Sequence, residues 1–283
     1  MTWVGKQPPP KTRVTFLGCI LALVRAVCLA LAIFFGFLMM KVLRLIEIPF
    51  FGQSRPITPY ITKIVCSLAL KILGLRCRVC GRPMQKNGAI VANHTSWLDI
   101  FVLNAVQTVY FVSKTEVANW PFIGQLAKIT GTVFIDRNPR SALDHRNLFV
   151  TRLQSGHRLL FFPEGTSTDG QQVLEFKSTL FAAFFKTSLK EHSFVQAVSV
   201  FYHAPRGEDL RFYGWWGDMS FGKHMLQTLM SLKSGAVYVV FSEPLAVIDF
   251  VDRKSLTVAL HSLVELTHRK SRNCKNHPKE TLM

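Results

Sequence analysis

Acidic side chains are scarce in this 283-residue chain, which has 17 Asp and Glu residues against 34 Lys and Arg residues. The formal net charge of +17 indicates an anionic partner, such as nucleic acid, acidic lipid headgroups or an acidic carrier protein. No Cys/His finger spacing is present, and the 23 Phe residues lie mostly in apolar runs rather than among basic residues. These two absences argue against nucleic acid as the partner.

Cysteine is also sparse, with six residues, and Cys77 and Cys80 form a lone CxxC with no second pair at zinc spacing. We place this pair in a strand, where positions three apart face opposite sides, so neither shared metal ligation nor a redox pair is expected. We expect reduced thiols in a domain that faces the cytoplasm. No H-E-x-x-H motif or paired-carboxylate cluster occurs, so the sequence predicts neither a metal nor a cofactor.

One long apolar run, Val14 to Met40, has 27 residues and Arg25 as its only charge. It is long enough to cross a bilayer, and it is too long for a signal peptide and lacks a small-x-small cleavage site. We therefore predict a retained membrane anchor. Because Arg25 would be costly in hydrocarbon, the segment is expected to be a tilted span or a bent hairpin in one leaflet.

The segment Ile61 to Leu75 fits either an interfacial amphipathic helix or an ordinary helix packed on the domain. The basic residues Lys41 and Arg44 after the anchor predict a domain facing the cytoplasm, at the inner membrane if the protein is bacterial. Trp215-Trp216 fits a membrane-interface belt, which we favour, or loop packing. The predicted organisation is a lead-in and anchor (1–52), a catalytic domain (53–268) and a basic, disordered tail (269–283).

Apolar strands at Ala89 to Ala92, Gly131 to Ile135 and Leu159 to Phe162 each end in a polar cluster. This pattern is typical of an open α/β sheet whose functional site lies at the strand ends. Further predicted strands are Val109 to Val112, Val195 to Phe201 and Val237 to Phe241, and further predicted helices are Ser141 to Gln154, Ser178 to Leu189 and Ser255 to Thr267, with Ser255 as N-cap.

His94 follows the first of these strands, and Asp99 lies five residues further on. A histidine whose far ring nitrogen meets a carboxylate is suited to general-base chemistry, because the carboxylate fixes the tautomer and stabilises the imidazolium. Ser96 to Asp99 also fits a helix capping box, and both interpretations can hold together. Ser96 itself lacks the G-x-S-x-G context of a nucleophile.

Four motifs in order resemble the lysophosphatidate (1-acylglycerol-3-phosphate) acyltransferase family over about residues 75 to 245. They are His94-x4-Asp99, Phe134-Ile135-Asp136-Arg137, Phe162-Pro163-Glu164-Gly165-Thr166 and the weaker Val195-Gln196-Ala197-Val198-Ser199-Val200. The resemblance implies a glycerolipid-acyltransferase-like α/β fold, a mixed sheet flanked by helices. It also implies direct transfer of a fatty acyl group, without an acyl-enzyme, from a thioester of acyl carrier protein or coenzyme A to a lysolipid hydroxyl.

Each candidate site residue has an expected role. His94 is the expected base and Asp99 its orienting partner. Gly165 and Thr166 are expected to offer backbone N–H groups to an oxyanion or headgroup oxygen. Arg137 is suited to a bidentate phosphate contact and Glu164 to orienting the acceptor. Lys114, placed just past its strand, is a headgroup ligand or a solvated lysine.

The acceptor is where the chain departs from the family pattern. Many lysophosphatidate enzymes have arginine directly after Glu-Gly-Thr, whereas this chain has Ser167, followed by Thr168-Asp169-Gly170. That arrangement also resembles acyltransferases of lyso-ornithine lipid, an acceptor without phosphate. We put 1-acylglycerol-3-phosphate, giving phosphatidate, first and lyso-ornithine lipid second. A membrane lipid- or carrier-binding protein without turnover is the alternative from another class.

Overall fold

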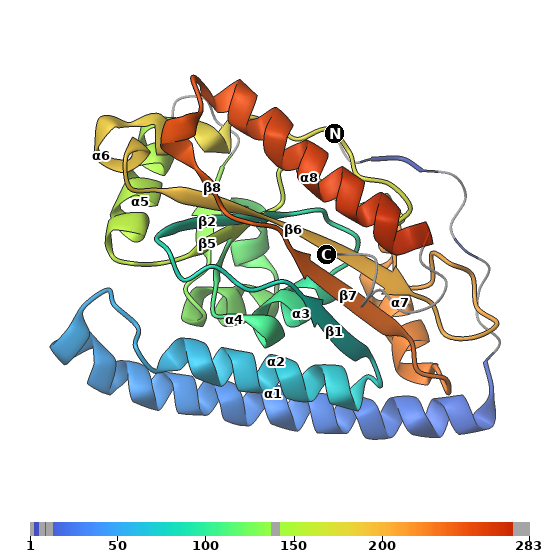
Figure 1. Ribbon diagram of the computed structural model, residues 1–283. Helices are drawn as coiled ribbons and strands as arrows, with labels where there is room; N and C mark the ends of the chain where they lie inside the picture. Colours follow the sequence, from blue (N-terminus) through green and yellow to red (C-terminus); the bar gives the residue numbers. More distant parts are fainter. Residues whose placement is uncertain (1–2, 6–8, 10–13, 137–141, 274–283) are drawn as a thin grey trace.

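A mixed eight-stranded sheet forms the centre of the molecule, in the order β1-β7-β6-β2-β5-β3-β4, with β8 paired to β6 (Figure 1). The computed structural model describes residues 3–5, 9, 14–136 and 142–273. β2, β3, β4, β5 and β6 run parallel to one another, whereas β7 and β8 are antiparallel to β6, and β7 is parallel to β1. The strands are β1 (Arg76–Cys80), β2 (Gly88–Ala92), β3 (Tyr110–Lys114), β4 (Val133–Ile135), β5 (Leu159–Phe161), β6 (Phe194–His203), β7 (Ala236–Phe241) and β8 (Leu245–Ala246).

Helices cover both faces of this sheet. The helices are α1 (Phe16–Phe51), α2 (Thr58–Ile72), α3 (Leu98–Val106), α4 (Ile123–Ile129), α5 (Ala142–Gln154), α6 (Thr187–Lys190), α7 (Phe221–Met230) and α8 (Arg253–Asn273), and the 3-10 turns are η1 (Thr115–Asn119), η3 (Leu180–Phe185) and η4 (Val247–Asp249). The predicted fold class, a mixed sheet flanked by helices behind an apolar N-terminal helix, is confirmed.

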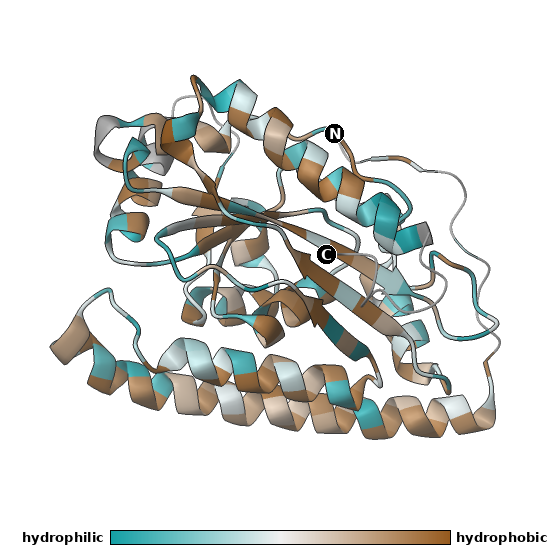
Figure 2. Cartoon of the chain, viewed as in Figure 1, coloured by the Kyte–Doolittle hydropathy of each residue, from teal (hydrophilic) through white to brown (hydrophobic). Residues whose placement is uncertain are grey.

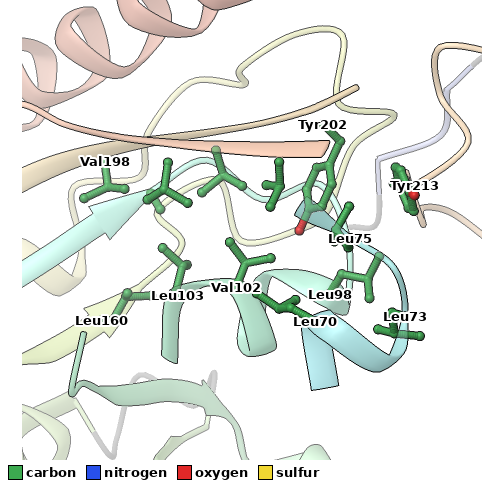
Figure 3. Packing of buried hydrophobic residues seen from close by; sticks show 14 of the residues in the cluster. Leu70, Leu73, Leu75, Leu98, Val102, Leu103, Leu160, Val198, Tyr202 and Tyr213 are labelled. Carbon is green, nitrogen blue, oxygen red and sulfur yellow. The ribbon is translucent and has the colours of Figure 1, made fainter. Parts of the chain in front are cut away.

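β2 shows why the sequence reads as a continuous apolar run there. All five of its residues are buried, and alternate side chains serve opposite faces of the sheet. Ile90 packs with α2 and α3, where Leu70 and Leu103 meet the sheet (Figure 3). Val91 faces the second core, formed with α5, η3 and α8. Strand β2 therefore has rigid packing on both sides, which fixes the loop that follows it.

α1 carries the predicted apolar run and continues to Phe51, a 36-residue helix long and apolar enough to cross a membrane. It lies antiparallel to α2 beneath the domain (Figure 1), and most of its residues are hydrophobic (Figure 2). Its contacts with the domain are spread along its length. Arg25 Nη1 donates to the carbonyls of Leu229 and Ser231 at 3.0 and 2.8 Å, and Glu47 accepts from Thr58 N and Oγ1 at 2.9 and 2.8 Å.

The packing answers two questions that the sequence left open, namely the role of α2 and the role of the tryptophan pair. α2 buries Ile61, Ala69 and Leu70 against the domain while Ile64 on its other face is 66% exposed, so it is both a packed and an amphipathic helix. The favoured interface role of the tryptophan pair is wrong for Trp216. That side chain is 5% exposed and packs against Trp3, at 6.1 Å between ring centroids.

The segment predicted as one helix from Ser178 to Leu189 is instead η3 followed by the single turn α6. Phe181 and Phe184 are both fully buried, and a 3-10 turn, with three residues per turn, points side chains three apart in the same direction. Within α5, Phe149 is 1% exposed and faces the core, whereas its neighbour Leu148 is 39% exposed.

Two predictions about α8 need correction. Its cap is Asp252 rather than Ser255: Asp252 Oδ1 accepts from Ser255 N at 2.8 Å, and Ser255 Oγ accepts from Asp252 N at 3.3 Å. This reciprocal pair places Ser255 at the third helical position. The helix also continues to Asn273, so the first residues of the predicted disordered tail are helical. Residues 274–283 lie outside the described residues.

Candidate functional site

The carboxyl ends of five neighbouring strands meet at one edge of the sheet, because β6, β2, β5, β3 and β4 are parallel. His94 follows β2, Glu164 follows β5 and Lys114 ends β3. Asp136 directly follows β4, and Arg137 lies outside the described residues. The topology therefore brings the described members of the motifs to the same edge, as the strand-end pattern predicted.

His94 and Asp99 form a direct pair. The distance from His94 Nδ1 to Asp99 Oδ2 is 2.7 Å, the His94 side chain is 20% exposed and the Asp99 side chain is fully buried. The imidazole also lies flat on the Phe162 ring, with 4.0 Å between ring centroids and an interplanar angle of 11°. The ring is thus held at one nitrogen and along one face, so that Nε2 is the nitrogen left to act on a substrate.

Asp99 is surrounded by donors. Its Oδ2 also accepts from the backbone N–H groups of Thr95 and Ser96 at 2.8 and 3.0 Å, and its Oδ1 accepts from the Tyr202 hydroxyl at 2.6 Å. Three donors besides the imidazole compensate for the burial of this carboxylate. The contact with Ser96 N is the one expected of a capping box. The same carboxylate therefore caps α3 and orients His94.

Tyr202 was not predicted as a site residue. It reaches from β6 toward the start of α3 (Figure 3), and it is 103 residues from Asp99 in the chain. Burial, together with the neighbouring Asp99 carboxylate, raises the pKa of the Tyr202 hydroxyl well above its usual value, so the hydroxyl remains a donor. No local pattern marks it, because it lies in an apolar strand two residues past the weak fourth motif.

Glu164 ties two loops together rather than facing open space. Its Oε1 accepts from His94 N at 2.7 Å, its Oε2 accepts from Leu174 N at 3.0 Å, and the residue is 2% exposed. Burial raises the pKa of the Glu164 carboxyl to about 8, although the two N–H donors oppose this shift. This geometry favours a positioning role for Glu164 over the expected direct contact with the acceptor.

The segment after Glu-Gly-Thr holds the other side of the histidine loop. Thr168 N donates to His94 O at 3.0 Å. Gly170 has a φ of +74°, and a Cβ on it would lie 2.6 Å from Thr95 Cγ2. A side chain at position 170 would therefore push against the residue that follows His94. This contact gives a structural reason for the Thr168-Asp169-Gly170 sequence that the motif comparison had noted only as a departure.

Two backbone N–H groups, those of Gly165 and Thr166, were expected to face a substrate oxygen, but one of them is occupied within the turn. Gly165 N donates to Phe162 O at 3.0 Å and thereby closes the turn, which Gly165 permits with a φ of +72°. Thr166 Oγ1 accepts from Trp3 N at 3.3 Å, so residues preceding α1 reach the site. Thr166 N is therefore the better candidate for a substrate oxygen. Lys114 is exposed at the end of β3.

The site as a whole places a histidine–carboxylate pair, with the histidine partly exposed, beside an apolar ring and a backbone turn. Such a site is suited to removing a proton from an alcohol. The Acyltransferase family model matches residues 77–201, which include all four motifs.

Relatives extend this match to nearly the whole chain. The lyso-ornithine lipid O-acyltransferase of Rhodobacter capsulatus is 53% identical over 262 residues, covering 93% of this chain and 95% of the relative. The 1-acyl-sn-glycerol-3-phosphate acyltransferase of Neisseria gonorrhoeae is 39% identical over 132 residues, 45% of this chain and 50% of the relative. The crystal structure of a 1-acyl-sn-glycerophosphate acyltransferase from Thermotoga maritima has the same fold. It superposes with a TM-score of 0.65 at 19% identity, covering 92% of this chain and 98% of that structure.

The chain belongs to the 1-acylglycerol-3-phosphate acyltransferase family, which includes the lyso-ornithine lipid acyltransferases. It is a membrane-associated enzyme that acylates lysolipids.

Proposed function

We propose that lyso-ornithine lipid is the principal acceptor of this enzyme and that an acyl thioester is the donor. The observation that supports this acceptor most strongly is the 53% identity, over 93% of the chain, to a lyso-ornithine lipid O-acyltransferase. The site agrees with it. Ser167, 9% exposed, stands where many lysophosphatidate enzymes have arginine, so the turn beside His94 lacks that phosphate ligand.

The proposed mechanism uses His94 as the general base. Asp99 accepts a hydrogen bond from Nδ1–H of His94, which leaves the Nε2 lone pair to remove the proton of the acceptor hydroxyl. The oxygen attacks the thioester carbonyl, and Thr166 N stabilises the oxyanion that forms. The C–S bond then breaks, and the leaving thiolate takes the proton from the imidazolium. Glu164 and Thr168 keep the His94 backbone in place throughout.

A second acceptor, 1-acylglycerol-3-phosphate, is supported by a separate observation. The Neisseria relative named for that substrate is 39% identical over 132 residues. The sequence motifs placed this acceptor first, with Arg137 as its phosphate ligand. Thioesters of acyl carrier protein and of coenzyme A both fit as donors, since both are anionic and the chain carries a net charge of +17.

Acyl-transfer assays test the acceptor. Purified membranes containing the enzyme should acylate lyso-ornithine lipid faster than 1-acylglycerol-3-phosphate, with either thioester as donor. Ser167→Arg should lower the rate on lyso-ornithine lipid about tenfold or more, because it puts a buried charge beside the His94 loop. Ser167→Ala is the matched control and should keep most activity. Acylation of 1-acylglycerol-3-phosphate alone, unimpaired by Ser167→Arg, would reverse the order of the two acceptors.

We also propose that α1 lies along one leaflet instead of crossing the bilayer, with the catalytic domain on the cytoplasmic side. The contacts of Arg25 with the end of α7, and of Glu47 with the start of α2, bind both halves of α1 to the domain. Leu23, Leu31 and Phe34 are 66%, 50% and 58% exposed on its outer surface. An apolar surface on a docked helix is suited to the interfacial region of a bilayer.

Thiol labelling tests this arrangement. Cysteine is introduced singly before and after α1, as Val14→Cys and Ser54→Cys, and inverted inner-membrane vesicles are treated with a membrane-impermeant maleimide. Both cysteines should react from the cytoplasmic side if α1 lies in one leaflet. The unsubstituted protein supplies the background from its own thiols. Reaction of Ser54→Cys alone would show that α1 spans the membrane.

A further inference from the structure

A cavity of about 260 Å³ lies at the opposite edge of the sheet from His94. Its polar lining includes Arg55, Thr108, Tyr110, His157 and Arg158, and its rim carries apolar residues of the α1–α2 turn. Tyr110 begins β3 and Arg158 immediately precedes β5, so the cavity faces the amino ends of these strands. Arg158 and Phe162 are four residues apart along β5, or about 13 Å. The cavity is thus separate from the proposed acyl-transfer site.

Positive charge accumulates around this cavity. Arg55 Nη1 donates to Ile129 O at 2.6 Å, and Arg158 donates to Met84 O and Thr108 Oγ1 at 3.0 and 3.1 Å. Arg152, just behind the lining, donates to Gly131 O and lies 5.0 Å from the Tyr110 ring. All these partners are neutral. Among the described residues, no carboxylate forms an ion pair with any of the three arginines.

Glu47 is a carboxylate whose charge acts on Arg55, but its hydrogen bonds and its ion pair are made with other groups. Glu47 accepts from Ile57 N and Thr58 N at 2.7 and 2.9 Å, which caps the start of α2, and it pairs with Arg44 at 3.1 Å. It is 1% exposed. Its charge therefore acts mainly on Arg44 and the positive end of α2, and it raises the pKa of Arg55 only as a minor contribution. Among the described residues, none of the guanidinium groups at the cavity is in an ion pair.

Buried polar atoms in the cavity also lack partners. His157 is 3% exposed, and neither of its ring nitrogens has a hydrogen-bond partner. The backbone of Gln53 faces the ring without meeting hydrogen-bond geometry. Arg55 Nε is likewise buried and unpartnered. Burial, together with the positive charges of Arg152 and Arg55, lowers the pKa of His157 to about 4, so the neutral ring keeps one N–H to donate.

We propose that this cavity is an anion site that binds a phosphate group, supplied by an anionic membrane lipid. Arginine guanidinium groups and a neutral imidazole N–H are the donors that phosphate oxygens accept from, and a bound phosphate would satisfy the buried Arg55 Nε and His157 nitrogens. The cavity lining also includes Phe51 at the end of α1 and Tyr60 in the first turn of α2, which are 52% and 59% exposed. A lipid source rests on the proposed position of α1 at the membrane, whereas free phosphate would not need it.

Equilibrium binding to the full-length protein in a non-ionic detergent tests this site. The probes are dioctanoyl phosphatidylglycerol, dioctanoyl phosphatidylcholine and inorganic phosphate, each followed by calorimetric titration. The unsubstituted protein should bind the anionic lipid more tightly than the zwitterionic one. Arg55→Gln should weaken that binding about tenfold or more, since it removes a charged hydrogen bond. His157→Leu, which removes only unpartnered nitrogens, should weaken it while preserving the fold.

Arg253→Gln is the matched control: it removes the same charge from α8, on the other side of the sheet from α1 and α2 (Figure 1), and should bind the anionic lipid normally. Binding of inorganic phosphate alone, with the same dependence on Arg55 and His157, would assign the site to free phosphate. Absence of binding, or binding unchanged in both cavity variants, would overturn the proposal. Because acyl transfer is not measured, that result would leave the enzyme mechanism standing.

Discussion

Replacing His94 with alanine is expected to lower turnover by about 10²- to 10⁴-fold, the usual contribution of a positioned general base. The side chain is 20% exposed at the strand ends, and its backbone contacts with Glu164 and Thr168 do not need the imidazole. The melting temperature should therefore change little. Single-turnover and steady-state rates on membranes, with lyso-ornithine lipid as acceptor, provide the measurement.

The control for this variant is His192→Ala, which removes an exposed histidine outside the site and should keep full activity. Near-normal turnover in His94→Ala would show that His94 is not the base, and the His94–Asp99 pair would then be a structural feature only. Loss of activity accompanied by a large fall in melting temperature would indicate that the imidazole supports the loop more than it supports the chemistry.

Asp99→Asn is expected to impair both activity and stability. The amide keeps the shape of the carboxylate, but it loses the charge that two backbone N–H groups, the Tyr202 hydroxyl and His94 Nδ1 all contact. Turnover should fall by about 10²-fold or more, because the His94 tautomer is no longer fixed. Poorly satisfied buried donors cost about 1–3 kcal/mol, which corresponds to a fall of roughly 3–10 °C in melting temperature.

Tyr202→Phe tests the Oδ1 contact of Asp99 apart from its Oδ2 contacts. It removes a single donor to Oδ1 and leaves the Oδ2 contacts with His94, Thr95 and Ser96 unchanged. Its loss of activity should be much smaller than that of Asp99→Asn. If Asp99→Asn lowered the melting temperature but left turnover intact, the carboxylate would act only as a helix cap.

The local parts of this protein could be predicted from its sequence. β2 is apolar at consecutive positions because both of its faces are buried, so it could be recognised as an inner strand. His94 and Asp99 are only five positions apart in the chain, and α1 depends on one continuous apolar run. Each of these features arises within a short window, where spacing and side-chain chemistry suffice. The same reasoning predicted the α/β fold and the strand-end position of the site.

Contacts between distant segments were decided only by the tertiary structure. Tyr202 contacts Asp99, which is 103 residues away in the chain, and Arg25 contacts carbonyls more than 200 residues away. Arg55 and His157 come from distant parts of the sequence and line the same cavity. A buried polar group must find a partner, but the sequence does not specify which one, because packing of whole elements sets which groups meet. Packing also explains why the segment predicted as a helix from Ser178 to Leu189 contains η3 instead, since Phe181 and Phe184 both face the core.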